Sequence, residues 1–125
     1  ICSMFFDVSR LLSPFEVAVA GVTFRPDYPK NVWALSAQMV MYPVPVTLVR
    51  EPNNEADSNA IKVMVREQEV GYIPALTAGQ LAKEIDNGET WRGVLDRIVV
   101  SPSNPEQPGI RIKVFRSEGL ERQSR

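Results

Sequence analysis

The stretch Leu48–Ile73 reads LVREPNNEADSNAIKVMVREQEVGYI and is the most informative part of the sequence. Apolar and polar residues alternate at both of its ends, which is the period of two that a half-buried β-strand requires. The segment Glu51–Asn59 between them is rich in Asn and Asp, whose short side chains bond to neighbouring backbone groups and favour loops. We therefore predict strands at Val44–Arg50 and Ala60–Arg66, joined by an ordered polar loop.

Four further segments have the composition of short strands. Along Ile110–Arg116, for example, apolar residues alternate with basic ones, so that one face would be buried. A tight turn at Glu67-Gln68 would lead from the central stretch into the next strand. The further predicted strands are Phe15–Phe24, Glu69–Ile73, Trp91–Val100 and Ile110–Arg116.

One helix is well marked, at Thr77–Asp86, because its apolar residues recur at the spacing of one helix face. Thr77 and Gln80 have the spacing of a capping box, in which each side chain bonds to the other's backbone N–H. The Asn-Gly pair that follows can adopt the left-handed conformation that ends a helix. The segment Asn31–Met41 is either a second, weaker helix or irregular.

Six short strands with one or two short helices predict a mainly β (β+α) fold, a small closed six-stranded β-barrel of the OB-like or SH3-like kind. Closure protects strand edges from pairing with other chains, and Gly93, inside a predicted strand, would permit a sharp bend. An open α+β sandwich is the competing architecture. We expect the domain to span residues 15–117, after an N-terminal extension at 1–14 and before a flexible polar tail at 118–125.

The composition excludes several classes of protein. With 14 Lys and Arg against 15 Asp and Glu, the net charge of −1 excludes binding through bulk positive charge. The absence of histidine and the single cysteine, Cys2, exclude a Cys/His zinc site and catalytic sets that need histidine. The sequence holds no phosphate-loop motif, no carboxylate cluster suited to two metal ions and no membrane-spanning run. We expect a non-enzymatic, intracellular domain without cofactor, zinc or membrane contact.

The order of residues in the central stretch resembles the pattern of the HIRAN domain family. That pattern is a strand ending in Arg, then E-P-N-N, a spacer, D-x-N-A-I-x-V, and G-Y-I-P before a helix. The family's first strand also ends in Gly followed by an aromatic, which Gly21-Val22-Thr23-Phe24 matches here, and the resemblance extends over roughly Val17 to Val114. The matching residues of the central pattern are Arg50, Glu51-Pro52-Asn53-Asn54, Asp57, Asn59-Ala60-Ile61, Val63 and Gly71-Tyr72-Ile73-Pro74.

This resemblance implies a modified OB-like barrel with helical additions. HIRAN domains occur alone in bacteria and phages, and as the N-terminal module of SWI/SNF-type DNA-remodelling helicases. The best-understood members bind single-stranded DNA and grip its free 3′-hydroxyl end. On this basis we expect a non-catalytic module for single-stranded DNA in DNA repair or replication processing, with the 3′ end as candidate ligand and helicases or nucleases as candidate partners.

The resemblance also implies roles for four residues. Phe24 would stack on a terminal base, a contact that contributes about 1–3 kcal/mol. Asp57, which only accepts hydrogen bonds when ionised, would bind a 3′-hydroxyl and repel a 3′-phosphate. Asn54 would donate to a phosphate oxygen, and Tyr72 would stack or donate its O–H. The structural alternatives are that Phe24 fills the barrel core and that Asp57 and Asn54 simply form the turn.

The sequence departs from the DNA-end-binding members at four positions. They carry a basic residue before the first-strand aromatic, where this chain has Thr23, and a second aromatic before the loop Asp, where it has Ala56. They have His in place of Tyr72 and a basic residue in place of Ala75. Because one lost stack lowers affinity roughly ten- to a hundredfold, we expect weaker binding than in those members.

The alternative function is a protein–protein interaction module on the same barrel, with the DNA-end pocket lost. An exposed Phe24 beside Asp57 in one cleft would favour DNA binding, whereas a buried Phe24 with Asp57 turned into its own loop would favour the alternative. The basic residues of the central strands are expected to be solvated rather than phosphate ligands: Arg50, Lys62 and Arg66.

Overall fold

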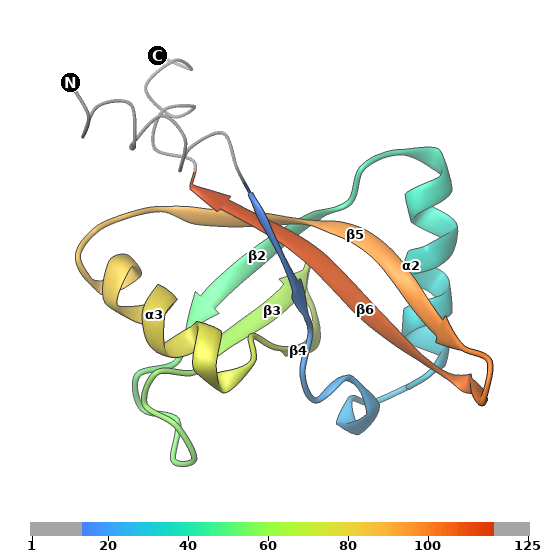
Figure 1. The fold of residues 1–125 in the computed structure, drawn as a ribbon, viewed down its shortest axis with the longest axis horizontal. Helices are drawn as coiled ribbons and strands as arrows, with labels where there is room; N and C mark the ends of the chain where they lie inside the picture. Colours follow the sequence, from blue (N-terminus) through green and yellow to red (C-terminus); the bar gives the residue numbers. More distant parts are fainter. Residues whose placement is uncertain (1–13, 117–125) are drawn as a thin grey trace.

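The computed structural model describes residues 14–116 of the chain. Within this range all strands form one antiparallel sheet in the order β1-β6-β5-β2-β3-β4 (Figure 1). The predicted tail at 118–125, and the predicted N-terminal extension up to residue 13, lie outside the described residues. The strands are β1 (Phe15–Ala18), β2 (Pro45–Arg50), β3 (Ile61–Val65), β4 (Gln68–Tyr72), β5 (Trp91–Ser101) and β6 (Asn104–Arg116).

The sheet curls into a half-barrel whose two edges meet at one residue pair. Ala20, just after β1, donates its N–H to the carbonyl of Tyr72 at 2.7 Å, and Tyr72 donates back at 2.9 Å. Gly71 makes this approach possible, because a Cβ there would lie 2.5 Å from the oxygen of Ala20 and from a methyl group of Val19. The expectation of a mainly β, barrel-like fold is thus confirmed, and the open α+β sandwich is wrong.

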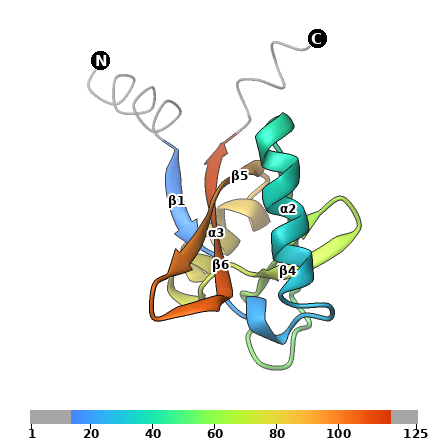
Figure 2. The same ribbon diagram turned by 90° about the vertical axis from the view of Figure 1, so that its right-hand side faces the viewer.

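Two helices accompany the sheet. Helix α2 (Lys30–Met41) packs against β5 and β6 (Figure 2). Helix α3 (Ala75–Asp86) lies at the other end of the molecule, beside the loop that joins β2 to β3 (Figure 1). The choice left open for Asn31–Met41 is therefore resolved in favour of a helix.

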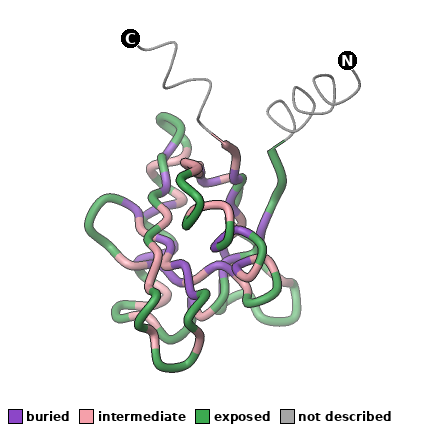
Figure 3. Tube along the Cα trace, turned by 90° about the vertical axis from the view of Figure 1, so that its left-hand side faces the viewer, coloured by how far each residue is buried: buried purple, intermediate pink, exposed green. Residues whose placement is uncertain are grey.

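The core is built from the apolar residues that alternate along the strands, and these lie at the centre of the molecule (Figure 3). The inward faces of β3 and β6 are those predicted from the sequence, and each of their core residues is at most 3% exposed. Burial of apolar surface contributes about 25 cal/mol per Å², so the burial of these inward faces is a main source of the stability of the fold. The core residues of these two strands are Ile61, Val63, Val65, Ile110, Ile112 and Val114.

The predicted first strand, Phe15–Phe24, is too long. Strand β1 ends at Ala18, and Val22–Phe24 form a single 3-10 turn, η1. The reason lies at Gly21, whose left-handed backbone (φ 72°) turns the chain out of the strand direction. Phe24 is therefore presented on a turn and not at the end of a strand.

Other boundaries also differ from the sequence prediction. Helix α3 begins at Ala75, and the capping box of Thr77 with Gln80 is wrong, since the extended Pro74 precedes the helix and no side chain caps it. The turn between β3 and β4 is Arg66-Glu67, one residue earlier than predicted. Strand β6 begins at Asn104, well before the predicted Ile110, because the hairpin turn occupies only two residues after Ser101.

Candidate functional site

A pocket of about 320 Å³ opens where the β2–β3 loop, the end of β4 and the start of α3 meet. Its walls are mostly apolar, with one carboxylate, one amide and one phenol among them. Three of the four residues predicted for the site line it, two from the β2–β3 loop and one from the end of β4. The lining residues are Ala20, Asn54, Ala56, Asp57, Ala60, Tyr72, Ile73 and Ala75.

Asp57 supplies the carboxylate of the pocket. One of its oxygens, Oδ1, accepts the backbone N–H of Asn59 at 2.9 Å, and its main-chain carbonyl accepts the N–H of Ala60 at 3.0 Å. A carboxylate has two oxygens with several lone pairs, so fixing the loop leaves Asp57 with acceptor capacity for a hydroxyl. Asp57 is therefore both a turn former and a candidate ligand-binding group.

Asn54 holds the loop that carries Asp57. Its side-chain oxygen accepts the backbone N–H groups of Ala56 at 2.9 Å and Asp57 at 3.1 Å. Its side-chain Nδ2 donates to Oε1 of Glu51 at 3.0 Å. Most of the hydrogen-bonding capacity of this amide is thus used within the protein, which is the structural alternative named for it above.

Tyr72 forms the aromatic wall of the pocket. Its phenol donates to Oε1 of Glu51 at 2.9 Å, and the guanidinium of Arg25 lies 5.8 Å from its ring centroid. Burial, and then the hydrogen bond to Glu51, raise the pKa of the Tyr72 phenol. Since its O–H is already bonded, stacking is the role that the ring can offer a ligand.

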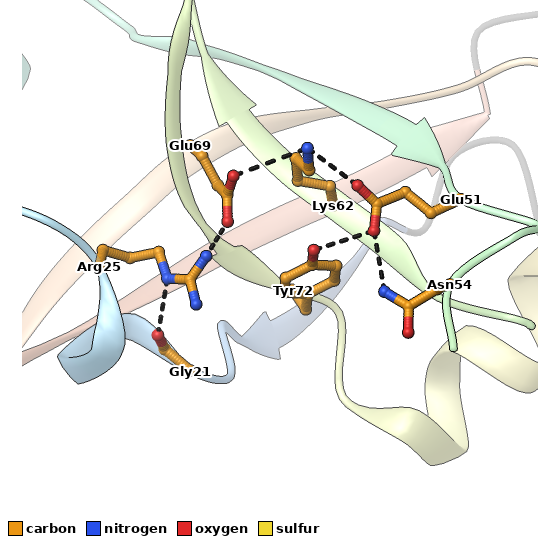
Figure 4. Close-up of polar contacts among 7 residues, drawn as sticks. All are labelled: Gly21, Arg25, Glu51, Asn54, Lys62, Glu69 and Tyr72. Atoms are coloured by element: carbon orange, nitrogen blue, oxygen red, sulfur yellow. Dashed lines mark hydrogen bonds and ion pairs between the residues drawn. The ribbon is translucent and has the colours of Figure 1, made fainter. Parts of the chain in front are cut away.

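Glu51 connects these groups, and its role was missed from the sequence. Besides Asn54 and Tyr72, it binds Nζ of Lys62 at 2.8 Å, and the pKa of its carboxyl is lowered to about 2, chiefly by Lys62 (Figure 4). Lys62 also lies 3.6 Å from Glu69, which in turn pairs with Arg25. The alternating charges therefore form one chain from η1 to the loop.

Phe24 lies near this pocket but does not line it. It is 81% exposed, so the alternative that it fills the barrel core is wrong. Its neighbour Arg25 lies over the Tyr72 ring, which places η1 on the Tyr72 side of the site. Phe24 is thus an exposed aromatic close to the pocket, and it does not share one cleft with Asp57.

The basic residues of the central strands are occupied by protein groups. Arg50 makes two 3.0 Å contacts with Asp86 and donates to the carbonyls of Ser58 and Ala60, which ties the loop to α3. The Arg50 hydrogen bond lowers the pKa of the Asp86 carboxyl. The Arg50 and Lys62 side chains are only 13% and 24% exposed, so their expected solvation is wrong, while the exposed Arg66 bonds to a tyrosine hydroxyl.

Among residues 14–116, no group of three or more His, Cys, Asp or Glu side chains is arranged to hold a metal ion. In the same range, no helix is both long and apolar enough to span a bilayer.

Together these features define a mainly β domain in which a curled sheet carries a small pocket at its closing edge. The chain matches the HIRAN domain family over residues 13–117 and belongs to that family, whose members are generally DNA-binding modules. A search of curated proteins found no match.

Two solved structures are similar to this chain. The HIRAN domain of human HLTF shares 25% sequence identity at a TM-score of 0.55, over 87% of this chain and 81% of that one. A protein from Lactobacillus plantarum shares 21% identity at a TM-score of 0.54, over 82% of this chain and 94% of that one. The second similarity bears on the fold alone, whereas the first agrees with the family assignment.

Proposed function

We propose that this domain is a non-catalytic module that binds single-stranded DNA and receives a 3′-hydroxyl end in the pocket beside Asp57. The family supplies the ligand class, since HIRAN domains are generally DNA-binding. The observation that carries the proposal is the arrangement of Asp57 and Tyr72 around one mostly apolar pocket, with the exposed Phe24 nearby.

The chemistry of the pocket suits an uncharged strand end. The Asp57 carboxylate accepts a hydrogen bond from a hydroxyl and repels a terminal phosphate. The Tyr72 ring and the alanines of the wall offer apolar contact to the sugar and base. Phe24 offers a free aromatic face, and a base stacked on such a face contributes about 1–3 kcal/mol whatever its identity.

The electrostatics predict modest affinity and strong dependence on conditions. The cations nearest the site, Arg25, Arg50 and Lys62, are each paired with a carboxylate, so a DNA phosphate has to compete for them. With a net charge of −1, the domain gains little from general attraction to DNA. We therefore expect binding to be measurable at low salt and to weaken as salt is added.

A protein–protein interaction module is the second candidate. It is favoured by the way Asp57 bonds within its own loop through Oδ1, and by the small residues Ala56 and Ala75 in the pocket wall. Under either candidate, we propose an intracellular role in DNA repair or replication processing, with helicases or nucleases as partners.

The test is fluorescence anisotropy at low salt with a short labelled single strand that ends in either a 3′-hydroxyl or a 3′-phosphate. We expect the hydroxyl strand to bind about tenfold more tightly. Asp57→Asn keeps an oxygen for the Asn59 N–H but removes the charge, so the two strands should then bind alike.

Glu55→Gln is the matched control, because it removes one charge from the same loop at an exposed residue outside the pocket lining. It should preserve the preference for the hydroxyl end. Equal binding of both strands by the unchanged protein would contradict end recognition, and binding of neither strand would favour the interaction module.

A further inference from the structure

Glu51 contacts three groups of the site although it does not line the pocket. Its Oε1 accepts both the Tyr72 phenol at 2.9 Å and the Asn54 amide at 3.0 Å, and its Oε2 faces Lys62 at 2.8 Å. The first two partners both line the pocket and come from different elements, one from β4 and one from the β2–β3 loop (Figure 4). One carboxylate thus joins two walls.

The influence of Glu51 extends to the carboxylate of the pocket. Asn54, held by Glu51, accepts the backbone N–H of Asp57 through its own oxygen at 3.1 Å. A shift of the Asn54 amide would therefore release the backbone that aims Asp57. The Glu51 side chain is 23% exposed and the Lys62 side chain 24%, so this connection lies partly under the surface.

We propose that Glu51 is the positioning residue of the pocket: it fixes the Tyr72 ring and, through Asn54, the Asp57 loop, without contacting the ligand itself. This inference rests on the proposed function for its ligand, but the positioning can be measured without one. Lys62 supports this role, because its ammonium group stabilises the ionised form of Glu51, which accepts both hydrogen bonds.

The sign of the effect separates positioning from simple electrostatics. A negative charge beside a binding site for DNA opposes the phosphates, so removing it should tighten binding if charge were its only contribution. If Glu51 holds the pocket in shape, removing it should weaken binding despite the lost repulsion. The two explanations thus predict opposite changes for one substitution.

The first experiment measures binding of the 3′-hydroxyl strand by Glu51→Ala and Glu51→Gln, with Glu55→Ala as the control for a lost loop charge. We expect Glu51→Ala to bind about tenfold more weakly. Glu51→Gln should be intermediate, because its amide oxygen still accepts from Tyr72 but no longer pairs with Lys62. Glu55→Ala should bind as well as the unchanged protein or more tightly.

The second experiment needs no DNA. Glu51 contributes to the raised pKa of the Tyr72 phenol. Ultraviolet titration follows tyrosine ionisation, and the step that disappears in Tyr72→Phe belongs to Tyr72. That step should move to lower pH in Glu51→Gln. Circular dichroism establishes that each variant is folded, and Glu51→Gln stands in for Glu51→Ala if the latter does not fold.

The outcomes are distinct for the two proposals. A folded Glu51 variant that binds as tightly as the unchanged protein, or an unmoved Tyr72 titration, overturns the positioning role. If the unchanged protein binds no DNA but the Tyr72 titration moves, the proposed function fails while Glu51 still positions the ring.

Discussion

Two of the concave regions formed by residues 14–116 differ in size and in chemistry, and the larger of the two is the less informative. A groove of about 720 Å³ lies between β2 and β5, against about 320 Å³ for the pocket beside Asp57. The groove exists because these strands pair only at Pro45–Val94 and Val46–Gly93 before they separate. Among the described residues that line it, none is acidic, and its walls include Leu48, Trp91 and Phe115.

The difference shows that fixed polar groups, and not volume, mark the candidate site. In the pocket, the backbone of Asp57 and the phenol of Tyr72 are held by hydrogen bonds that lead back to Glu51. A ligand therefore meets groups that are already ordered and loses little entropy in arranging them. The groove offers apolar area without a comparable set of aimed acceptors.

The largest predicted effect is on the free energy of unfolding, and it is tested by replacing one glycine in each region. Gly71, at the closing edge beside the pocket, has φ 154° and no room for a Cβ, whereas a Cβ at Gly93 in the groove would lie 3.1 Å from the Lys113 carbonyl. We expect Gly71→Ala to lower the free energy of unfolding by about 3 kcal/mol and Gly93→Ala by about 1 kcal/mol. Urea unfolding measures both, and equal losses would contradict the closure described here.

The next effect concerns the exposed aromatic near the pocket. Phe24→Ala should reduce affinity for single-stranded DNA about tenfold or more, because a stacking platform is lost. Stability should change little, since Phe24 is 81% exposed. Met41→Ala, at a residue 78% exposed on α2, is the control and should leave anisotropy titrations unchanged. A similar loss in both variants would remove the special role of Phe24.

Acid should weaken the pocket region through Glu51. Its pKa is lowered from 4.5 to about 2, so its contribution to stability is present above pH 4.5 and is lost as the pH falls toward 2. Allowing for solvent screening of a side chain that is 23% exposed, the contribution is about 1 kcal/mol.

Glu51→Gln should therefore be less stable than the unchanged protein at neutral pH and converge with it in acid. Thermal unfolding followed across this pH range measures the difference. A stability gap that stays constant down to about pH 2 would show that ionised Glu51 contributes nothing to the fold.

The smallest effect is expected in the groove. Thr47→Ala removes an exposed side chain from its lining and should change DNA affinity by less than about twofold. A loss of DNA affinity comparable to that of Phe24→Ala would show that the groove, and not only the pocket, contributes to DNA binding.

The sequence predicted the core more accurately than the site. Alternation along β3 and β6 identified their buried faces, because burial repeats every second residue in any strand. Phe24 was predicted to end the first strand and instead lies on a turn, because the left-handed backbone at Gly21 turns the chain away from the strand. The capping box at Thr77 failed for a related reason, as Pro74 fixes where the helix begins.

The pocket itself was only partly predictable. Asn54, Asp57 and Tyr72 were found through a family pattern, and the structure brings them to one pocket. The role of Glu51 depends on Lys62 and Tyr72, which reach it only once β3 and β4 are paired in register. Lys62 faces Val49 across β2 and β3, and Glu51 follows Val49 by two residues, but this register comes from the structure and not from the sequence.

The most direct test of the central claim, that the pocket and not the groove receives a DNA strand end, is a nuclear magnetic resonance titration. A short single strand with a 3′-hydroxyl would be added at low salt to the ¹⁵N-labelled chain. We predict amide shifts in residues 54–60 and 72–76 and around Phe24, with the amides of Trp91 and Gly93 unmoved. Shifts confined to the groove residues would contradict it.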